Sequence, residues 1–156
     1  MNREELKNYL TNTFPTATIG ETFDFALIEV AKEELLEVAT KLKNAPETQF
    51  DFLFCETAID RIETFEVVYH LRSINYQHEL ELKVKLDKLE LPELPKIASV
   101  YSLWQAAEFY ENEIFDLFGI WFDGHPKLRR MILGDEWPGY PLRKGYEYPD
   151  IEKTLK

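Results

Sequence analysis

Alternating apolar and polar residues predict three consecutive strands in the middle of the chain. Aromatic residues alternate over residues 50–55, and Phe65, Val67 and Tyr69 recur at every second position. The clearest alternation is at 79–86, where leucine and valine alternate with glutamate and lysine. A period of two is typical of a sheet with one face on a core and the other in water. We therefore expect residues 48–90 to form three neighbouring strands.

The residues before these strands predict a helix, a strand and a second helix. Asn2 and Glu5 have the spacing of a capping box that opens the first helix. Residues 23–30 form an apolar run that predicts a buried strand. Apolar residues then recur at helical spacing from Leu35 to Leu42, and Pro46 prevents this helix from continuing.

A third, longer helix is predicted after the strands. Ser102 and Gln105 can form a capping box, and one apolar stripe runs from residue 103 to 118 at helical spacing. Trp104 and Phe115 fall on a different face of this helix, so we expect it to be buried on two sides. Gly119 is placed to end it in a left-handed cap. This helix also carries four acidic residues, which predict a solvated face rather than an acid–base pair: Glu108, Glu111, Glu113 and Asp116.

Regular periodicity stops at residue 119. The last 38 residues are rich in glycine and proline but also contain tryptophan and tyrosine, which argue against disorder. We therefore expect a folded domain over residues 1–118 and an extended arm over 119–156 that is ordered by docking.

The charge of the chain is uneven. The net charge is −11, which disfavours nucleic acid as a partner. Residues 124–145 hold five basic and two acidic side chains, so this segment is +3 and the remainder is −14. Arginine is favoured where a planar carboxylate is bound at an interface. Plain surface charge is the alternative, but we hypothesise that Arg129, Arg130 and Arg143 bind carboxylates of a partner.

Several kinds of chemistry have no support in the sequence. A lone cysteine, Cys55, allows no intrachain disulfide, and an iron–sulfur cluster needs about four ligands. Phosphate-binding glycine loops are absent from the sequence, and His70 and His78 are expected to be ordinary sheet residues. His125 stands in a turn and is expected to hydrogen-bond backbone or a partner. The N-terminus lacks the apolar run of a signal peptide, and no apolar run reaches the roughly 20 residues that span a bilayer.

Three motifs in the second half of the chain resemble a known family. They are Glu-Asn-Glu-Ile-Phe-Asp-Leu-Phe-Gly-Ile at 111–120, Phe-Asp-Gly-His-Pro-Lys-Leu-Arg-Arg-Met at 122–131 and Trp-Pro-Gly-Tyr-Pro-Leu-Arg-Lys at 137–144. Together they resemble the signature of the C subunit of bacterial complex I, the homologue of a mitochondrial 30 kDa subunit. The resemblance also extends to the predicted strand at 65–71. Asn112 and Gly145 stand where the family usually has Arg and Asp.

The resemblance implies an α+β fold, with a two-layer domain in which helices pack on a mixed sheet, followed by an extended irregular arm. It implies a non-catalytic peripheral-arm subunit of a proton-translocating NADH:quinone oxidoreductase, placed on the cytoplasmic face of the bacterial inner membrane and reaching the membrane only through the complex. The chain itself would bind no cofactor or metal, whereas NADH, flavin, iron–sulfur clusters and quinone would belong to the complex.

The partners implied are the quinone-site large subunit and the cluster-bearing subunits. The alternatives are the equivalent subunit of a membrane-bound energy-converting hydrogenase or another quinone oxidoreductase, and a free-standing adaptor with a basic arm. The motif residues expected at the interface are Glu111, Glu113, Asp116, Gly119, Gly124, His125, Pro126, Arg129, Arg130, Trp137, Arg143 and Lys144.

Overall fold

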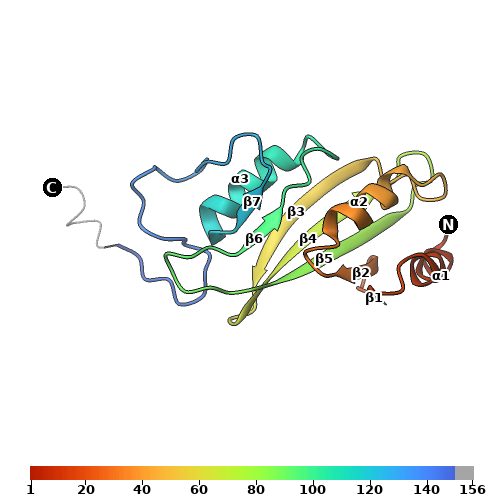
Figure 1. Ribbon diagram of the computed structural model, residues 1–156, viewed down its shortest axis with the longest axis horizontal. Helices are drawn as coiled ribbons and strands as arrows, with labels where there is room; N and C mark the ends of the chain where they lie inside the picture. Colours follow the sequence, from red (N-terminus) through yellow and green to blue (C-terminus); the bar gives the residue numbers. More distant parts are fainter. Residues whose placement is uncertain (150–156) are drawn as a thin grey trace.

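A five-stranded mixed sheet packed with three helices forms the body of the protein, as the computed structural model shows for residues 1–149 (Figure 1). The elements are α1 (Arg3–Thr13), β1 (Thr18–Glu21), β2 (Ala26–Val30), α2 (Leu35–Asn44), β3 (Phe52–Asp60), β4 (Thr64–Arg72), β5 (Glu79–Asp87), β6 (Lys96–Ala98), α3 (Ala107–Phe118) and β7 (Trp121–Asp123). The predicted α+β class is confirmed. The last seven residues of the predicted arm, 150–156, lie outside the described residues.

The strand order in the large sheet is β1-β2-β5-β4-β3. Only β2 and β5 run parallel, and the other pairs are antiparallel. The three strands predicted from the alternating pattern are confirmed as β3, β4 and β5. The inward residues of β4 and β5, such as Phe65 and Leu82, are fully buried. They form one core with the apolar residues of all three helices, for example Leu10, Leu42 and Ile114.

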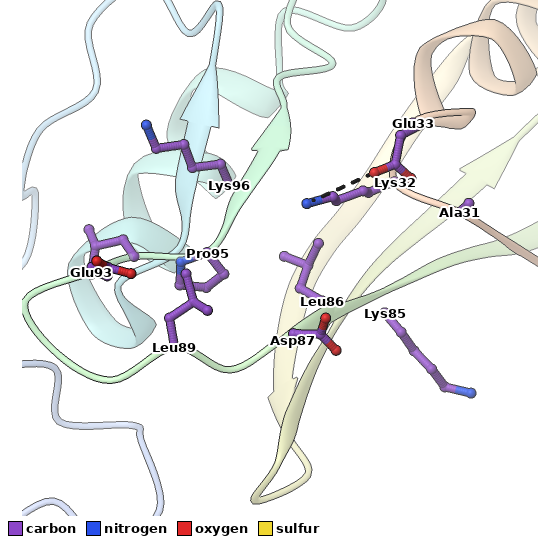
Figure 2. Close-up of a pocket in the computed structure, with 11 residues that line it drawn as sticks. Ala31, Lys32, Glu33, Lys85, Leu86, Asp87, Leu89, Glu93, Pro95 and Lys96 are labelled. Carbon is purple, nitrogen blue, oxygen red and sulfur yellow. Dashed lines mark ion pairs between the residues drawn. The ribbon is translucent and has the colours of Figure 1, made fainter.

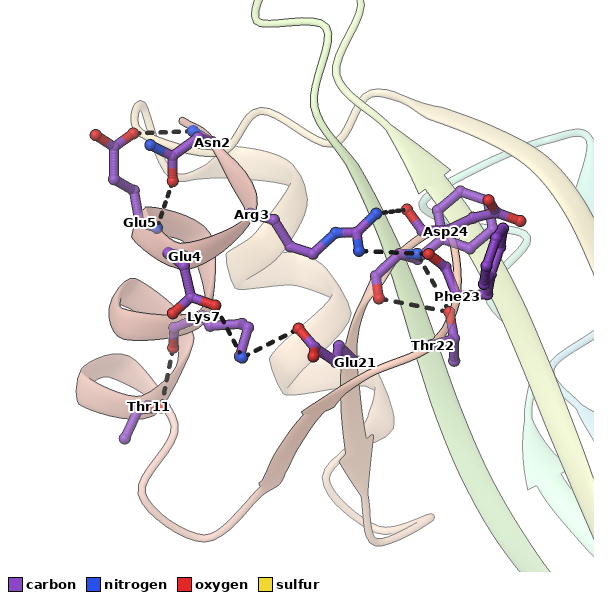
Figure 3. Close-up of polar contacts among 11 residues, drawn as sticks. Asn2, Arg3, Glu4, Glu5, Lys7, Thr11, Glu21, Thr22, Phe23 and Asp24 are labelled. Atoms are coloured by element: carbon purple, nitrogen blue, oxygen red, sulfur yellow. Dashed lines mark hydrogen bonds and ion pairs between the residues drawn. The ribbon is translucent and has the colours of Figure 1, made fainter.

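The predicted first helix is confirmed together with its cap (Figure 3). The Asn2 side chain accepts a hydrogen bond from the Glu5 amide at 2.9 Å, and the Glu5 carboxylate accepts one from the Asn2 amide at 2.9 Å. The strand predicted over 23–30 begins only at Ala26. Residues 22–25 turn between β1 and β2, which leaves Phe23 96% exposed, so its assignment to a buried strand was wrong. The Arg3 guanidinium donates to the carbonyls of Phe23 and Asp24 and joins α1 to this turn.

The third helix begins later than its sequence predicted. Residues 101–106 form turns, α3 starts at Ala107 without a side-chain cap, and Ser102 is exposed, so the second capping box was wrong. Trp104 precedes the helix and is buried, and its indole donates to the Phe50 carbonyl at 3.0 Å. The end of the helix was predicted correctly, since Gly119 adopts φ 69° as its left-handed cap.

The predicted arm begins inside the folded body. The strand β7 pairs in parallel with β6, and Ile120 and Phe122 are buried. From residue 124 to residue 149 the chain has no helix or strand and runs back along α3 (Figure 1). None of the helices within residues 1–149 has the length and apolar character needed to cross a membrane.

Candidate functional site

The motif residues meet at the junction between α3 and the arm. Glu111 and Asp116 are fully buried there, whereas Glu113 points to solvent. The expectation of a solvated acidic face was therefore wrong for Glu111 and Asp116 and right for Glu113. The reason is that the chain on either side of the helix folds over two of the carboxylates and provides donors for them.

Asp116 holds the arm through one carboxylate. Its oxygens accept hydrogen bonds from three successive backbone amides, those of Met131, Ile132 and Leu133, at 3.0, 2.7 and 2.9 Å. They also accept one from the Arg130 guanidinium at 2.9 Å. Burial by itself would raise the pKa of Asp116, but these hydrogen bonds outweigh it and hold the pKa below its ordinary value.

Two of the predicted interface arginines bind groups inside this chain. Arg130 also donates to the carbonyls of Asp116 and Gly139, at 3.0 and 2.9 Å. Arg143 is buried, and its guanidinium donates to the carbonyls of Phe118 and Gly119 at 2.7 and 3.2 Å. A cation at a helix C-terminus stabilises carbonyls that have no partner in the helix.

The remaining basic motif residues, Arg129 and Lys144, are exposed. The Arg129 amide donates to the Asn112 side chain at 3.0 Å, but its guanidinium has no hydrogen-bond or ion-pair partner among residues 1–149. The Lys144 amide donates to Asp60 at 2.8 Å, and Asp60 also pairs with Lys88 at 2.6 Å. Asp60 is therefore an anchor of the arm that the sequence pattern did not reveal.

The motif glycines and aromatic residues shape the arm. A Cβ on Gly119 would lie 2.7 Å from the Tyr140 ring, so only glycine fits there. Gly124 has φ 84° and leads into His125 and the exposed Pro126. The Trp137 ring is half-buried, and its indole nitrogen has no hydrogen-bond partner within the described part of the chain.

His125 joins the arm to the first half of α3. Its Nδ1 accepts a hydrogen bond from the Lys127 amide at 3.0 Å, and its Nε2 lies 2.9 Å from the Glu108 carbonyl. The Nε2 atom also lies 3.9 Å from the Glu111 carboxylate. The expectation that this ring hydrogen-bonds backbone is confirmed.

A second buried acid was not foreseen. Glu56 of β3 is 4% exposed, and within residues 1–149 neither of its carboxylate oxygens has a hydrogen-bond partner. Burial and, next, the charge of Glu111 raise the pKa of Glu56 well above its ordinary value. Burial likewise raises the pKa of Glu111 to about 7, although Ser99 and the Val100 amide donate to it and oppose the rise.

A cleft lies away from this junction (Figure 2). It is bordered by the loop between β2 and α2, the end of β5 and the connector that leads to β6. Both lysine and acidic side chains line it, and Lys32 pairs with Glu33 at 4.0 Å. Within residues 1–149, no group of three histidine, cysteine or acidic side chains is arranged to hold a metal ion.

Comparison with known proteins identifies the family. Residues 28–152 match the family model described as respiratory-chain NADH dehydrogenase, 30 Kd subunit. The chain is 38% identical to the C subunit of NADH-quinone oxidoreductase from Moorella thermoacetica over 139 residues, which are 88% of this chain and 90% of that protein. It is 42% identical over 121 residues to the C/D subunit of NADH-quinone oxidoreductase from Phocaeicola vulgatus, covering 77% of this chain and 22% of that longer protein.

A solved structure shares the fold. It belongs to the membrane-bound sulfane sulfur reductase, an archaeal respiratory membrane complex, and superimposes with a TM-score of 0.79 at 23% identity. The superposition covers 97% of this chain and 89% of that one. The family model and the relative at 38% identity show that the chain belongs to the family of the 30 kDa subunit, also named the C subunit, of respiratory NADH:quinone oxidoreductase.

Proposed function

We propose that this chain is a non-catalytic subunit of the peripheral arm of a proton-translocating NADH:quinone oxidoreductase. Its role is to hold the quinone-site subunit and the cluster-bearing subunits in fixed positions. It binds no cofactor itself, and NADH, flavin, iron–sulfur clusters and quinone are bound by its partners. It reaches the cytoplasmic face of the bacterial inner membrane only through the complex.

The observation that carries this proposal is the way the arm is fixed. Internal hydrogen bonds to Asp116, Arg130 and Arg143 hold a segment that has no helix or strand of its own. This leaves a set of apolar and basic side chains exposed along it, which we name the docking face: Arg129, Met131, Ile132, Leu142 and Lys144. Ordered apolar side chains flanked by arginine are typical of protein interfaces.

The chemistry of the docking face indicates its partner. Met131, Ile132 and Leu142 are 38%, 57% and 49% exposed, and both cations that flank them are exposed and can pair with acidic groups. An apolar surface with acidic residues around it would complement this face. The name of the Phocaeicola vulgatus relative joins the C and D subunits in one chain, which supports the D subunit as the neighbour.

Identity favours this function over the alternatives. The relatives at 38% and 42% identity are NADH-quinone oxidoreductase subunits, whereas the sulfane sulfur reductase chain shares the fold at 23% identity. A hydrogenase subunit or a free-standing adaptor therefore has less support.

The test is to replace Arg129 and Lys144 together by alanine. The melting temperature of the isolated chain should stay unchanged, because neither side chain packs inside it. The yield of intact complex on a native gel, and NADH-driven quinone reduction, should fall at least tenfold, since losing one partner of a desolvated pair costs roughly 2–5 kcal/mol. Lys32→Ala, an exposed lysine near the distant cleft, serves as the matched control. Normal assembly of the double variant would remove the docking face from the interface.

A further inference from the structure

Glu56 and Tyr69 place two unsatisfied polar groups side by side in the core. They are direct partners in the β3–β4 register. Tyr69 is 0% exposed and Glu56 is 4% exposed. The Tyr69 hydroxyl and both oxygens of Glu56 are without a hydrogen-bond partner among residues 1–149. A buried polar group in this condition needs an explanation, because leaving it unpaired costs free energy.

Glu111 of α3 is a second buried carboxylate, and its charge is one cause of the raised pKa of Glu56. In contrast to Glu56, both of its oxygens accept hydrogen bonds, one from Ser99 Oγ at 2.6 Å and one from the Val100 amide at 2.8 Å. An ionised carboxylate is an acceptor only, so this environment suits a charged Glu111. Within residues 1–149, no group donates a hydrogen bond to either oxygen of Glu56, so a charge there would be unstabilised.

The other titratable groups found around the pair within residues 1–149 are a thiol, a phenol, an acid and a histidine. Cys55 is next to Glu56 on β3, and the Tyr110 hydroxyl of α3 donates to the Phe54 carbonyl at 2.9 Å. Glu113 adds a further acid at the exposed side of α3. His125 is the nearest basic group, at 3.9 Å from Glu111. Its Nδ1 accepts a hydrogen bond from the Lys127 amide, and its Nε2 lies 2.9 Å from the Glu108 carbonyl, so both ring nitrogens have backbone partners.

Two charged carboxylates cannot share this interior without a cation. We propose that the folded protein keeps one proton on the Glu56–Glu111 pair at neutral pH, held on Glu56, and that this proton makes the packing of α3 on the sheet dependent on pH. The proton neutralises the acid that lacks donors and leaves the charge on the acid that has them. Its loss would place two negative charges between α3 and β3 and weaken their contact.

The sign of the pH dependence follows from the raised pKa values of both acids. In the unfolded chain both acids titrate near 4.5, whereas in the folded protein burial raises the pKa of Glu111 to about 7 and that of Glu56 well above 4.5. Folding therefore takes up a proton between these values. The stabilisation is fully present below pH 4.5 and is lost as the pH rises through the raised pKa values of the two acids, of which that of Glu111 is about 7.

The experiment measures unfolding of the full chain in urea between about pH 5.5 and about pH 8. One proton taken up on folding changes the folding equilibrium constant by about tenfold per pH unit. The wild type should lose stability with that slope in the lower part of the range. Glu56→Gln, which mimics the protonated acid, should reduce the slope, because Glu111 is then the only acid of the pair that titrates. Glu113→Gln, an exposed glutamate of the same helix, is the matched control and should keep it.

A second measurement does not depend on the variant folding. Carbon-13 NMR of glutamate-labelled wild-type protein should show one protonated carboxyl group at pH 7, and this signal should be absent from a folded Glu56→Gln variant. A wild type without a protonated glutamate at pH 7 would overturn the proposal. A slope that is the same in the wild type and Glu56→Gln would also overturn it.

Discussion

The two ends of α3 bury carboxylates in opposite ways. At the C-terminal end, Asp116 has four donors, three amides and one guanidinium, and is held to the arm as an anion. In the first half, Glu111 has two donors and faces Glu56, which has none within residues 1–149. All three acids are at least nine-tenths buried, yet the pKa of Asp116 is lowered and those of Glu111 and Glu56 are raised.

This difference shows that burial alone does not decide the charge of an acid. Desolvation raises the pKa at both ends of the helix, and the number of donors decides whether the rise survives. The arm is therefore attached to α3 through the charged Asp116. The contact between α3 and the sheet instead contains Glu56, which we propose to be neutral. The two ends should respond differently to substitution.

The largest effect is expected from Asp116→Ala. It would leave the Arg130 guanidinium and three amides without their acceptor, and breaking a buried pair in this way costs about 3–5 kcal/mol. The free energy of unfolding in urea measures this loss. Glu113→Ala, an exposed acid of the same helix, should change stability by less than about 0.5 kcal/mol. If both variants lose the same free energy of unfolding, the Asp116 site does not differ from ordinary surface charge.

A smaller effect is expected from Arg143→Ala. This change removes the cation from the Phe118 and Gly119 carbonyls at the end of α3, and hydrogen bonds to a charged group contribute about 1.5–3 kcal/mol. Thermal and urea unfolding of the isolated chain would detect it. The matched control is Arg129→Ala, which should leave stability unchanged. If the two variants are equally stable, the buried arginine does not act as a helix cap.

The smallest effect is expected from Ser99→Ala, which sharpens the comparison at the Glu56 end. Losing this donor to Glu111 should cost about 1.5 kcal/mol, the lower end of the range for a hydrogen bond to a charged group. It should also raise the pKa of Glu111 further, because Ser99 opposes the rise caused by burial. The variant would then lose stability at a higher pH than the wild type does. Unfolding curves at several pH values would show this shift. Ser102→Ala replaces an exposed serine and should not change the pH at which stability is lost.

Local sequence determined the parts of the fold that depend on near neighbours. The alternation over 65–71 and 79–86 predicted β4 and β5, because side chains of a strand point to opposite faces at every second residue. The Asn2–Glu5 cap and the Gly119 stop were also predictable, since each needs only residues within one helical turn. The three motifs between 111 and 144 likewise indicated the family directly.

Tertiary structure decided the short strands and the position of Phe23. The strands β6 and β7 pair across the whole of α3, so neither is visible in its own three residues. The length of β2 depends on the turn that Thr22 and Phe25 form with β1. Contacts between residues distant in sequence fix these features, and a local pattern does not contain them.

Tertiary structure also decided the environment of the buried acids. A register shift between Leu53 and Cys55 changes the alternation of β3, so that Leu53 and Glu56 both face the core. Without it, the alternation from Leu53 would place Glu56 on the outer face. The sequence alone established that four acids lie on the predicted third helix and that basic residues follow it along the chain. The fold of the arm and the bulge in β3 decide which of the acids are buried and which donors each acid receives. The reason is that hydrogen-bond partners so far apart along the chain meet only when the tertiary structure forms.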